Sequence, residues 1–440
     1  MTATISWDQL TTVSRYSSNG KEILTPKDKD LYQKADSLRP EWVIAVSGLV
    51  KQRPAGMENP NLENGQFEVQ ARSLEVLTQA ETSPFPLDNA GYEINEDVRM
   101  KYRYLDLRRP RLQKNIKLRS QFFQFIRSFL SKKGFTEIET PIIGKSTPEG
   151  ARDYLVPSRL QPGKFYALPQ SPQQYKQLLM VSGFEKYFQL ARCFRDEDTR
   201  GDRQPEFTQL DIEMSFIEIE DILSLIEELC LTAVKKLFPQ KKIIQAPFPR
   251  LNYQEVMAKY HSDKPDLRKD LKNNEELAFG FVVNFPMFEW KESEKRWDAV
   301  HHPFTRPQTE DIQEIKNHPE KILAFQYDLI CNGFEVGGGS LRSYRPEILQ
   351  AVFEVMGHQP EEIKIKFGHL LEAFQYGVPP HGGIALGLDR IMAILLNEPN
   401  IREVIAFPKT GDGRDLMMAA PSEARPGQLE ELNLEIKREE

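Results

Sequence analysis

Polar and apolar side chains alternate along residues 207–216. Phe207, Gln209, Asp211 and Glu213 fall on one side of the alternation, and the residues between them are mostly apolar. This period of two residues predicts a β-strand that turns its apolar side toward a core. The opposite side then carries an amide and two carboxylates in a row. Such a face is either a polar binding floor or the solvated outer face of an antiparallel sheet.

The residues just before this strand predict a turn and a second strand. Residues 196–203 are too charged and too rich in turn formers to belong to a strand. Phe194 and Arg195 lead into them. We therefore expect residues 194–216 to form two strands joined by a charged turn, with Arg195 near the polar face.

Residues 115–133 carry a helical pattern. Their apolar side chains recur close to helical spacing, and Gly134 follows as a stop signal. The apolar positions are Ile116, Phe122, Phe123, Ile126, Phe129 and Leu130. Taken alone, this pattern is typical of an amphipathic helix that packs on a core.

Two strands are expected nearer the N-terminus. Residues 42–50 and 66–76 have strand patterns, and the turn-rich residues 54–65 lie between them. Residues 93–106 then form a hinge. The residues after Pro421 form a charged tail.

Composition indicates a soluble globular protein. The 440 residues allow two or three domains, and 40% of them are hydrophobic and 28% charged. No apolar run is long enough to span a membrane, and the first residues lack a secretory signal pattern. Cys193, Cys230 and Cys331 are scattered and odd in number, which fits a reducing cytoplasm and argues against a disulfide framework or a cysteine zinc site.

The net charge of −7 is not that of a general nucleic-acid binder, although a local basic surface can still bind RNA. One basic cluster lies between residues 99 and 119. It consists of Arg99, Lys101, Arg103, Arg108, Arg109, Arg111, Lys114, Lys117 and Arg119. The favoured interpretation of this cluster is a solvated helix face.

Several segments resemble, in the same order, the motifs of class II aminoacyl-tRNA synthetases in their bacterial aspartyl form. Residues 134–141, 194–216 and 383–395 resemble the three signature motifs. Between the signature motifs lie four further matching segments, TPEGARDY (147–154), ALPQSPQQYKQLL (167–179), HHPFT (301–305) and NGFEVGGGSLR (332–342). The resemblance extends from about Glu41 to about Pro421.

This resemblance implies an α+β fold, with an antiparallel six-stranded sheet flanked by helices and preceded by a partial, all-β OB-like barrel. The expected organisation is a barrel-like domain over residues 1–88, a hinge over 89–114, a catalytic domain over 115–421 and a tail over 422–440. The family's inserted domain is expected to be missing near residues 249–280. The first two barrel strands have no match in Met1–Pro40.

The implied activity is that of an aspartate–tRNA ligase. ATP would activate L-aspartate as aspartyl-adenylate, and the aspartyl group would pass to the 3′ end of tRNA(Asp). The resemblance also implies a cytoplasmic homodimer, with no membrane association, whose interface is formed by the helix over 115–133 and the following strand, around Pro141.

The resemblance assigns roles around ATP. Arg195, Glu197 and Arg390 are the expected catalytic residues. Arg195 would bridge the α-phosphate and the substrate carboxylate, and Glu197 would meet the adenine amino group. Phe207 would stack under the adenine, and Arg390 would lie above it and reach the γ-phosphate. The remaining expected ATP ligands are Gln209 and Glu335, and Asp328 with Glu335 would hold Mg²⁺.

The resemblance also assigns roles around aspartate. Lys176 and Arg342 would hold the β-carboxylate. The residues expected elsewhere around the amino acid are Glu149, Ser171, Gln173, Asp211, His301 and His302. Of these, Gln173, Asp211 and Ser171 would lie near the α-amino group, Glu149 in a closing loop, and the histidines near the substrate carboxylate. A zinc site at the histidine pair is the alternative, but the sequence places no third ligand for it.

Other functions remain open at the level of sequence. An aspartate-activating paralogue of the asparagine-synthesis type would form the adenylate without charging tRNA. A second alternative is an enzyme that also charges tRNA(Asn). A non-catalytic RNA-binding relative is disfavoured because every matched catalytic position carries a competent residue.

The unmatched barrel strands give the first prediction. We expect weak discrimination of anticodon bases, because the family stacks these bases on its first barrel strands and each stacked base contributes about 1–3 kcal/mol. The measurement is kcat/KM on tRNA(Asp) transcripts with each anticodon base replaced. Losses of several hundredfold would mean that Met1–Pro40 forms a working barrel face.

Overall fold

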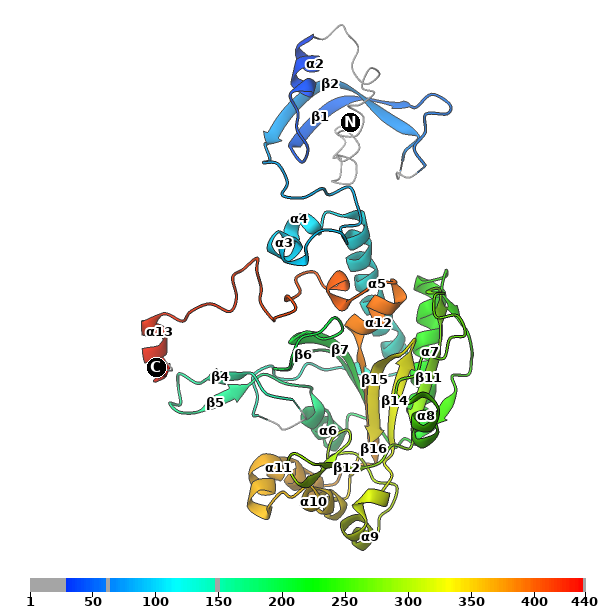
Figure 1. The fold of residues 1–440 in the computed structure, drawn as a ribbon, viewed down its shortest axis with the longest axis vertical. Coiled ribbons are helices and arrows are strands. Elements are labelled where there is room, and N and C mark those ends of the chain that lie inside the picture. The colour runs from blue at the N-terminus through cyan, green and yellow to red at the C-terminus, as the bar shows by residue number, and fades with distance from the viewer. Residues whose placement is uncertain (1–28, 61–63, 147–150, 438–440) are drawn as a thin grey trace. The chain divides into compact units, whose positions relative to one another are not determined.

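The computed structural model describes residues 29–60, 64–146 and 151–437. Its chain divides into two compact units, Met1–Pro86 and Leu87–Glu440 (Figure 1).

The described part of the first unit contains a helix and an antiparallel pair of strands. These are α2 (Lys29–Asp36), β1 (Val43–Gln52) and β2 (Phe67–Thr78). Both strands lie within two residues of the predicted ranges. A β-bulge follows Ser47 in β1, and at this point a Cβ on Gly48 would lie 2.2 Å from the carbonyl oxygen of Gln70. Most of Met1–Pro40 lies outside the described residues, so a barrel stays a prediction.

The second unit is built on an eight-stranded sheet with the order β3-β6-β7-β16-β15-β14-β11-β9. The strands are β3 (Thr136–Glu137), β6 (Lys186–Phe194), β7 (Glu206–Ser215), β9 (Arg250–Asn252), β11 (Phe279–Val283), β14 (Gln326–Cys331), β15 (Phe334–Leu341) and β16 (His381–Gly387). The six strands from β6 to β11 in this order are antiparallel, as predicted. The short strands β3 and β9 add a parallel pair at each edge.

Helices cover the sheet and extend beyond it. They are α3 (Glu96–Lys101), α4 (Arg103–Asp106), α5 (Pro110–Lys132), α6 (Gln173–Val181), α7 (Ile219–Leu237), α8 (Tyr253–Tyr260), α9 (Ile312–Asn317), η2 (Pro319–Lys321), α10 (Pro346–Val355), α11 (Pro360–Gln375), α12 (Leu388–Leu395), η3 (Ile401–Val404) and α13 (Pro426–Glu431). Three two-stranded pieces complete the unit: β4 (Leu155–Pro157) with β5 (Phe165–Ala167), β8 (Lys242–Ile243) with β10 (Glu276–Leu277), and β12 (Phe288–Lys291) with β13 (Arg296–Ala299).

The largest apolar core lies between the sheet and α5, α7 and α12 (Figure 1). Leu210 and Ile212 of β7 are fully buried in it, together with Ile126 of α5. The predicted alternation in β7 is therefore correct, since its apolar side packs on these helices. Its polar side faces away from this core, toward α6, with which β7 is in contact.

Helix α5 ends where the sequence predicted but begins earlier. Gly134 has a φ of +82°, a conformation that side chains with a Cβ rarely adopt, so it ends the helix. The helix begins at Pro110. Proline suits the first turn of a helix, because backbone N–H groups have no acceptor within the helix there and proline has no N–H to satisfy. The predicted range left out this first turn, in which Leu112 is fully buried and Arg111 pairs with Glu398 at 2.6 Å and with Glu403 at 2.7 Å.

A buried ionic cluster fixes the hinge. Asp106 is fully buried and accepts from Arg99, Arg103 and Arg109 at 2.6–3.1 Å. Glu403, which belongs to η3, binds Arg99 at 2.8 Å. Burial by itself would raise the pKa of the Asp106 carboxyl, but the hydrogen bonds from Arg99 and Arg109 outweigh it and hold the pKa below its usual value.

The interpretation of residues 99–119 as a solvated basic face is therefore wrong for Arg99, Arg103 and Arg109. Their guanidinium groups are buried against carboxylates that come from both ends of the unit. Asp106 lies only three to seven residues from these arginines, whereas Glu403 lies 304 residues after Arg99, so sequence distance concealed only the second pairing.

Residues 249–280 form β9, α8 and a short link to β10 and β11, and no separate folded domain lies within this range, all of which the structure describes. Of the helices in the described ranges, none is long and apolar enough to cross a membrane.

Candidate active site

The polar side of β7 carries a buried group of charges. Asp211 and Glu213 are fully buried, and their neighbours Lys176 and Arg342 are 2% and 1% exposed. Lys176 comes from α6, and Arg342 follows directly after β15, so three separate elements bring the four side chains together. Uncompensated charges of this kind are very costly to bury, so their pairing must be close.

The pairing within this group is close and asymmetric. The Lys176 ammonium donates to Asp211 at 2.7 Å and lies 3.2 Å from Glu213. The Arg342 guanidinium donates two parallel hydrogen bonds to Glu213, at 2.9 and 3.1 Å. Glu213 therefore joins both cations, and one oxygen of Asp211, Oδ2, has no hydrogen-bond partner among the described residues.

The two carboxyl groups differ in their proton affinity. For Glu213, burial alone would raise the pKa, but Arg342 and Lys176 outweigh it and lower the pKa to about 2. For Asp211, burial dominates over the attraction of Lys176, and the pKa is raised. A cationic group placed beside the unpartnered oxygen of Asp211 would compensate this carboxylate.

Two adjacent histidines line the same group. Arg342 donates to Nε2 of His302 at 2.7 Å and to the Ser340 hydroxyl at 2.6 Å. The rings of His301 and His302 lie 4.2 Å apart, and burial together with nearby Arg342 lowers the pKa of His301 to about 3 and that of His302 well below its usual value. Both imidazoles are thus neutral at physiological pH. Nδ1 of His301 is buried without a hydrogen-bond partner in the described part of the chain.

Of the residues predicted around the amino group, Asp211 lies on β7, Gln173 lies at the start of α6 and Ser171 lies just before it. Gln173 is buried and donates to the side chain of Gln177 at 3.1 Å. The Ser171 hydroxyl accepts from the backbone N–H of Gln173 at 3.3 Å. Glu149 lies outside the described residues.

Arg195 and Phe207 form a second part of the site. They stand on the ends of β6 and β7, and the Arg195 guanidinium lies 5.1 Å from the centre of the Phe207 ring. The Nε of Arg195 is buried without a partner among the described residues. Glu197 pairs with Arg203 at 3.5 Å, and Gln209 accepts from the thiol of Cys193 at 3.3 Å.

The side chains of Asp328 on β14 and Glu335 on β15 both lie close to Gly338 of β15. Asp328 pairs in register with Gly338 of β15. A Cβ on Gly338 would lie 3.1 Å from the Asp328 carboxylate, 3.6 Å from that of Glu335 and 3.7 Å from Nε2 of His301. Glycine therefore keeps open the space that these three side chains surround.

This pair of carboxylates fits a hard divalent cation. Burial, and after it the charge of Glu335, raises the pKa of Asp328 well above its usual value. Two carboxylates that repel each other in a buried site are compensated by a cation such as Mg²⁺. Among the described residues, no group of three or more His, Cys, Asp or Glu side chains is arranged to hold a metal.

Arg390 lies in the first turn of α12, the helix that directly follows β16. One of its nitrogens donates to the backbone carbonyl of Glu335, and another pairs with Asp202 at 3.1 Å. Its neighbour Asp389 is buried, accepts a hydrogen bond from the backbone N–H of Thr208 and forms an ion pair with Arg119, which ties α12 to β7 and α5.

Sequence reasoning missed three residues of the site. Glu213 stood on the predicted polar face but was not assigned a role, although it joins the two cations. Ser340 and His381 were not singled out. Ser340 contacts Arg342, and His381 lies 3.2 Å from the side chain of Gln177. Only Glu213 carried a signal, through its position in the alternation.

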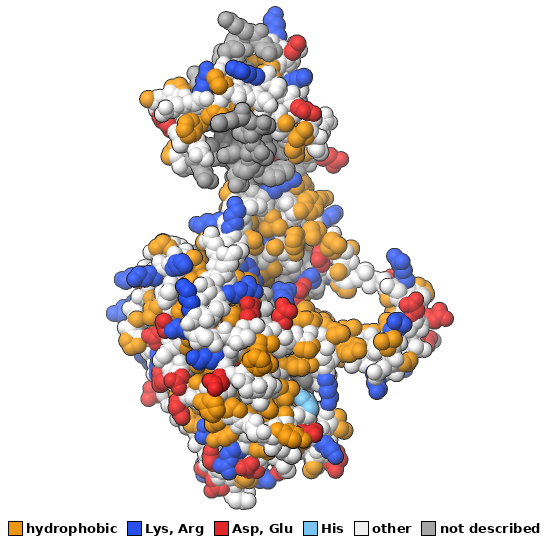
Figure 2. Space-filling model, turned by 180° about the vertical axis from the view of Figure 1, so that it is seen from behind, with side chains coloured by type: hydrophobic (Ala, Val, Ile, Leu, Met, Phe, Trp, Pro, Cys, Tyr) orange, Lys and Arg blue, Asp and Glu red, His pale blue; other side chains and the backbone are white. Residues whose placement is uncertain are grey.

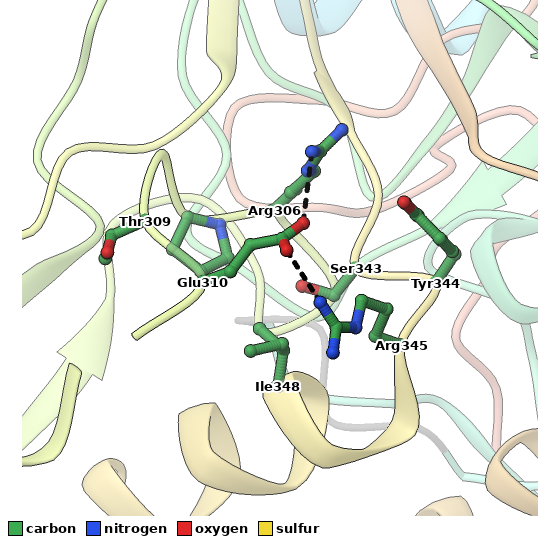
Figure 3. Close-up of a pocket in the computed structure, with 8 residues that line it drawn as sticks. Arg306, Thr309, Glu310, Ser343, Tyr344, Arg345 and Ile348 are labelled. Carbon is green, nitrogen blue, oxygen red and sulfur yellow. Dashed lines mark hydrogen bonds and ion pairs between the residues drawn. The ribbon is translucent and has the colours of Figure 1, made fainter. Parts of the chain in front are cut away.

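A small surface pocket lies beside the site but is separate from it (Figure 3). It is lined by residues that follow Thr305 and Arg342, including Arg306, Glu310 and Arg345. Glu310 binds both arginines, at 3.4 and 2.6 Å, so their charges are already compensated. None of the predicted site residues lines this pocket.

The low pKa of Glu213 predicts a loss of stability in acid. The folded protein holds this carboxylate ionised down to about pH 2, whereas its ordinary pKa is 4.5. The ionised group therefore stabilises the fold above pH 4.5, and this contribution is lost as pH falls from 4.5 to 2. Glu213→Gln should lower the free energy of unfolding by about 3–5 kcal/mol at neutral pH, because it leaves buried cations unpaired.

The measurement is urea unfolding of both proteins between pH 7 and pH 2. The difference between them should shrink below pH 4.5. Glu185→Gln, a change at an exposed position, serves as the control and should alter the free energy of unfolding only slightly. A difference that stayed constant across this range would contradict the assigned pKa.

Comparison with known proteins agrees with this architecture. Residues 95–411 match the family described as tRNA synthetases class II (D, K and N). The aspartate–tRNA(Asp/Asn) ligase of Dictyoglomus turgidum is 43% identical, with 93% of this chain and 89% of that protein aligned. The aspartate–tRNA ligase of Bacillus licheniformis is 40% identical over 93% of this chain and 90% of that protein.

The alignment with the Dictyoglomus protein also measures what this chain lacks. It runs over 530 positions but includes about 409 residues of this chain, so about 120 positions have no counterpart here. Because residues 41–440 number only 400, the aligned part also reaches into the first 40 residues.

Among solved structures, the asparaginyl-tRNA synthetase of Pyrococcus horikoshii, in complex with asparaginyl-adenylate, shares the fold. The TM-score is 0.66 at 24% identity, over 86% of this chain and 85% of that one. With a matched family domain and relatives of 40% and 43% identity along nearly its whole length, the chain belongs to the class II tRNA synthetases, within the group of aspartate–tRNA ligases.

Proposed function

We propose that this protein is an aspartate–tRNA ligase that activates L-aspartate with ATP and transfers it to the 3′ end of tRNA(Asp). The observation that carries the proposal is the pair of buried cations, Lys176 and Arg342, joined by Glu213 on the floor of the sheet. This arrangement lies in a chain that belongs to the aspartate–tRNA ligase group. Seven of the eight compared relatives carry the name aspartate–tRNA(Asp/Asn) ligase and one the name aspartate–tRNA ligase.

The charge distribution suits a substrate with two carboxylates and one ammonium. Arg342 has a planar fork of donors and suits a carboxylate, and Lys176 adds a second cation beside it. Asp211, with its unpartnered oxygen, suits the substrate ammonium. A neutral side-chain amide in place of the β-carboxylate would leave one of these buried cations less well compensated, so the site favours aspartate over asparagine.

The adenylate-forming step requires positioning and charge stabilisation rather than a protein nucleophile. In this proposal the substrate carboxylate attacks the α-phosphorus of ATP and pyrophosphate leaves. Arg195 donates to the α-phosphate oxygens, where charge develops, and its buried Nε is free of hydrogen bonds among the described residues. Phe207 offers an aromatic face to the adenine, and Glu197 an acceptor to its amino group.

Asp328 and Glu335 are the residues that would hold Mg²⁺. When bound, this ion neutralises phosphate charge as a Lewis acid. The role of the protein is to hold the two carboxylates on neighbouring strands and to leave space between them at Gly338.

The same proposal includes a homodimer formed through α5 and the segment after it. Ile142 and Ile143 are 42% and 53% exposed in this segment. Gly144 pairs with Ala167 of β5, so this segment continues into the β4–β5 hairpin, where Leu155 is 58% exposed. Figure 2 shows apolar side chains on the base of the projecting arm that contains this hairpin. Sedimentation equilibrium should give twice the chain mass of 50.9 kDa, and a monomer would contradict the proposal.

A second candidate function is the charging of both tRNA(Asp) and tRNA(Asn). It is favoured by the names of relatives such as the Dictyoglomus turgidum protein, aspartate–tRNA(Asp/Asn) ligase. The deciding experiment measures aspartylation of tRNA(Asp) and tRNA(Asn) transcripts beside aspartate-dependent ATP–pyrophosphate exchange. Exchange without any charging would instead identify an aspartate-activating enzyme that does not use tRNA.

Arg342→Leu should abolish aspartate binding and leave ATP binding nearly intact. Removing one partner of a buried charge pair costs about 2–5 kcal/mol, and here the lost partner faces the β-carboxylate. The measurement is the aspartate KM in pyrophosphate exchange, with the Kd for ATP determined separately.

Two further variants make the result specific. Arg345→Leu removes an exposed arginine three residues away and should leave the aspartate KM unchanged. Arg342→Lys keeps the charge but loses the planar fork, and it should lie between the leucine variant and the natural protein. An unchanged aspartate KM in a folded Arg342→Leu protein would refute the assignment.

A further inference from the structure

The charged connection between β6 and β7 contains a tight turn, which a backbone hydrogen bond from another segment holds in place. Arg200 and Arg203 exchange backbone hydrogen bonds at 3.4 and 3.2 Å, so Gly201 and Asp202 form the tip of a two-residue turn. The backbone N–H of Ile401 donates to the carbonyl of Gly201 at 3.1 Å. The side chain of Asp202 is thus presented in a defined direction.

Asp202 points to Arg390. Its carboxylate accepts from a terminal nitrogen of Arg390 at 3.1 Å, and the second terminal nitrogen donates to the carbonyl of Glu335. The Nε of Arg390 is buried and has no hydrogen-bond partner among the described residues. Arg390 therefore keeps an unsatisfied donor, although it already carries an ion pair.

The Asp202 carboxylate binds Arg390 in the way that a phosphate group could bind it. A carboxylate and a phosphate oxygen both accept from a guanidinium in the same geometry. A phosphate has more acceptor oxygens than the one Asp202 oxygen that Arg390 now binds, and it could also satisfy the Nε donor. The side chains of Arg390 and Asp202 are 24% and 37% exposed, so water can screen the pair and it can separate at small cost.

We propose that Asp202 holds Arg390 in the nucleotide-free protein and competes with a phosphate group of ATP for it. Asp202 is in this sense a positioning residue. It keeps the Arg390 guanidinium next to the site. When ATP binds, one of its phosphate groups replaces the Asp202 carboxylate as the partner of Arg390. The inference rests on the proposed function, because it takes Arg390 as a ligand of ATP.

The pair also connects the nucleotide site with the turn. A phosphate that takes over Arg390 releases the tip at Asp202, while the backbone bond between Ile401 and Gly201 still holds the base of the turn. ATP favours release of the turn from Arg390 by a certain factor. By linkage, release of the turn strengthens ATP binding by that same factor.

The test is the affinity of the complete protein for ATP, measured by equilibrium dialysis of labelled ATP without aspartate. Asp202→Asn should lower the Kd for ATP about two- to fivefold, which corresponds to the loss of a partly exposed ion pair that ATP must displace. The gain should diminish at high salt, because screening weakens the competing pair. Asp202→Glu keeps the charge and should show less gain.

Controls separate this effect from a general change in charge. Asp198→Asn removes the same charge from an exposed position in the same connection and should leave the Kd for ATP unchanged. In an Arg390→Ala background, the additional change Asp202→Asn should have no effect. Circular dichroism and thermal unfolding verify that each variant is folded.

The outcomes are distinguishable. If Arg390→Ala weakens ATP binding but Asp202→Asn leaves it unchanged or weakens it, competition is refuted while the role of Arg390 stands. If folded Arg390→Ala binds ATP like the natural protein, the assignment of Arg390 within the proposed function fails. An equal gain in Asp198→Asn would reduce the effect to net charge and would also refute the inference.

Discussion

The structure of the site depends on the compensation of Lys176 and Arg342 by Glu213. These three side chains are almost fully excluded from water, and each belongs to a different element of the sheet or its helices. Their burial is tolerable because Arg342 makes a bidentate contact with Glu213, and because Lys176 contacts both Glu213 and, more closely, Asp211. The position of β7 between its neighbours therefore fixes the position of both cations at the same time.

Asp106 has a comparable function in the hinge. It gathers three arginines, and Glu403 connects one of them to η3 near the C-terminal end of the unit. The neighbouring residue Arg402 pairs with Glu96 at 2.6 Å, and Ile401 binds the turn at Gly201. A continuous set of contacts thus extends from the hinge to the connection between β6 and β7, whose Asp202 pairs with Arg390.

Family membership and most of the central fold could be predicted from the sequence. The alternation in residues 207–216, the helical pattern before Gly134 and the order of the motifs depend on local periodicity and on short segments, which a sequence contains directly. The predictions failed where tertiary packing decides which charged side chains are buried. Arg99, Arg103 and Arg109 look like a solvated basic face until Asp106 and Glu403 are brought against them. The first turn of α5 was also missed; in it Leu112 is buried and Arg111 pairs with Glu398 and Glu403.

The sequence by itself determined the class II synthetase family, the strand pattern of β7 and the residue types available for an aspartate and nucleotide site. Only the tertiary structure decided which of these charges meet. It placed Glu213 between two cations, left oxygens and nitrogens of Asp211, Arg195 and Arg390 unpartnered among the described residues, and set Asp202 against Arg390. The physical reason is that periodicity specifies which face of an element is polar, whereas the energy of a buried charge depends on its distance to partners from other elements.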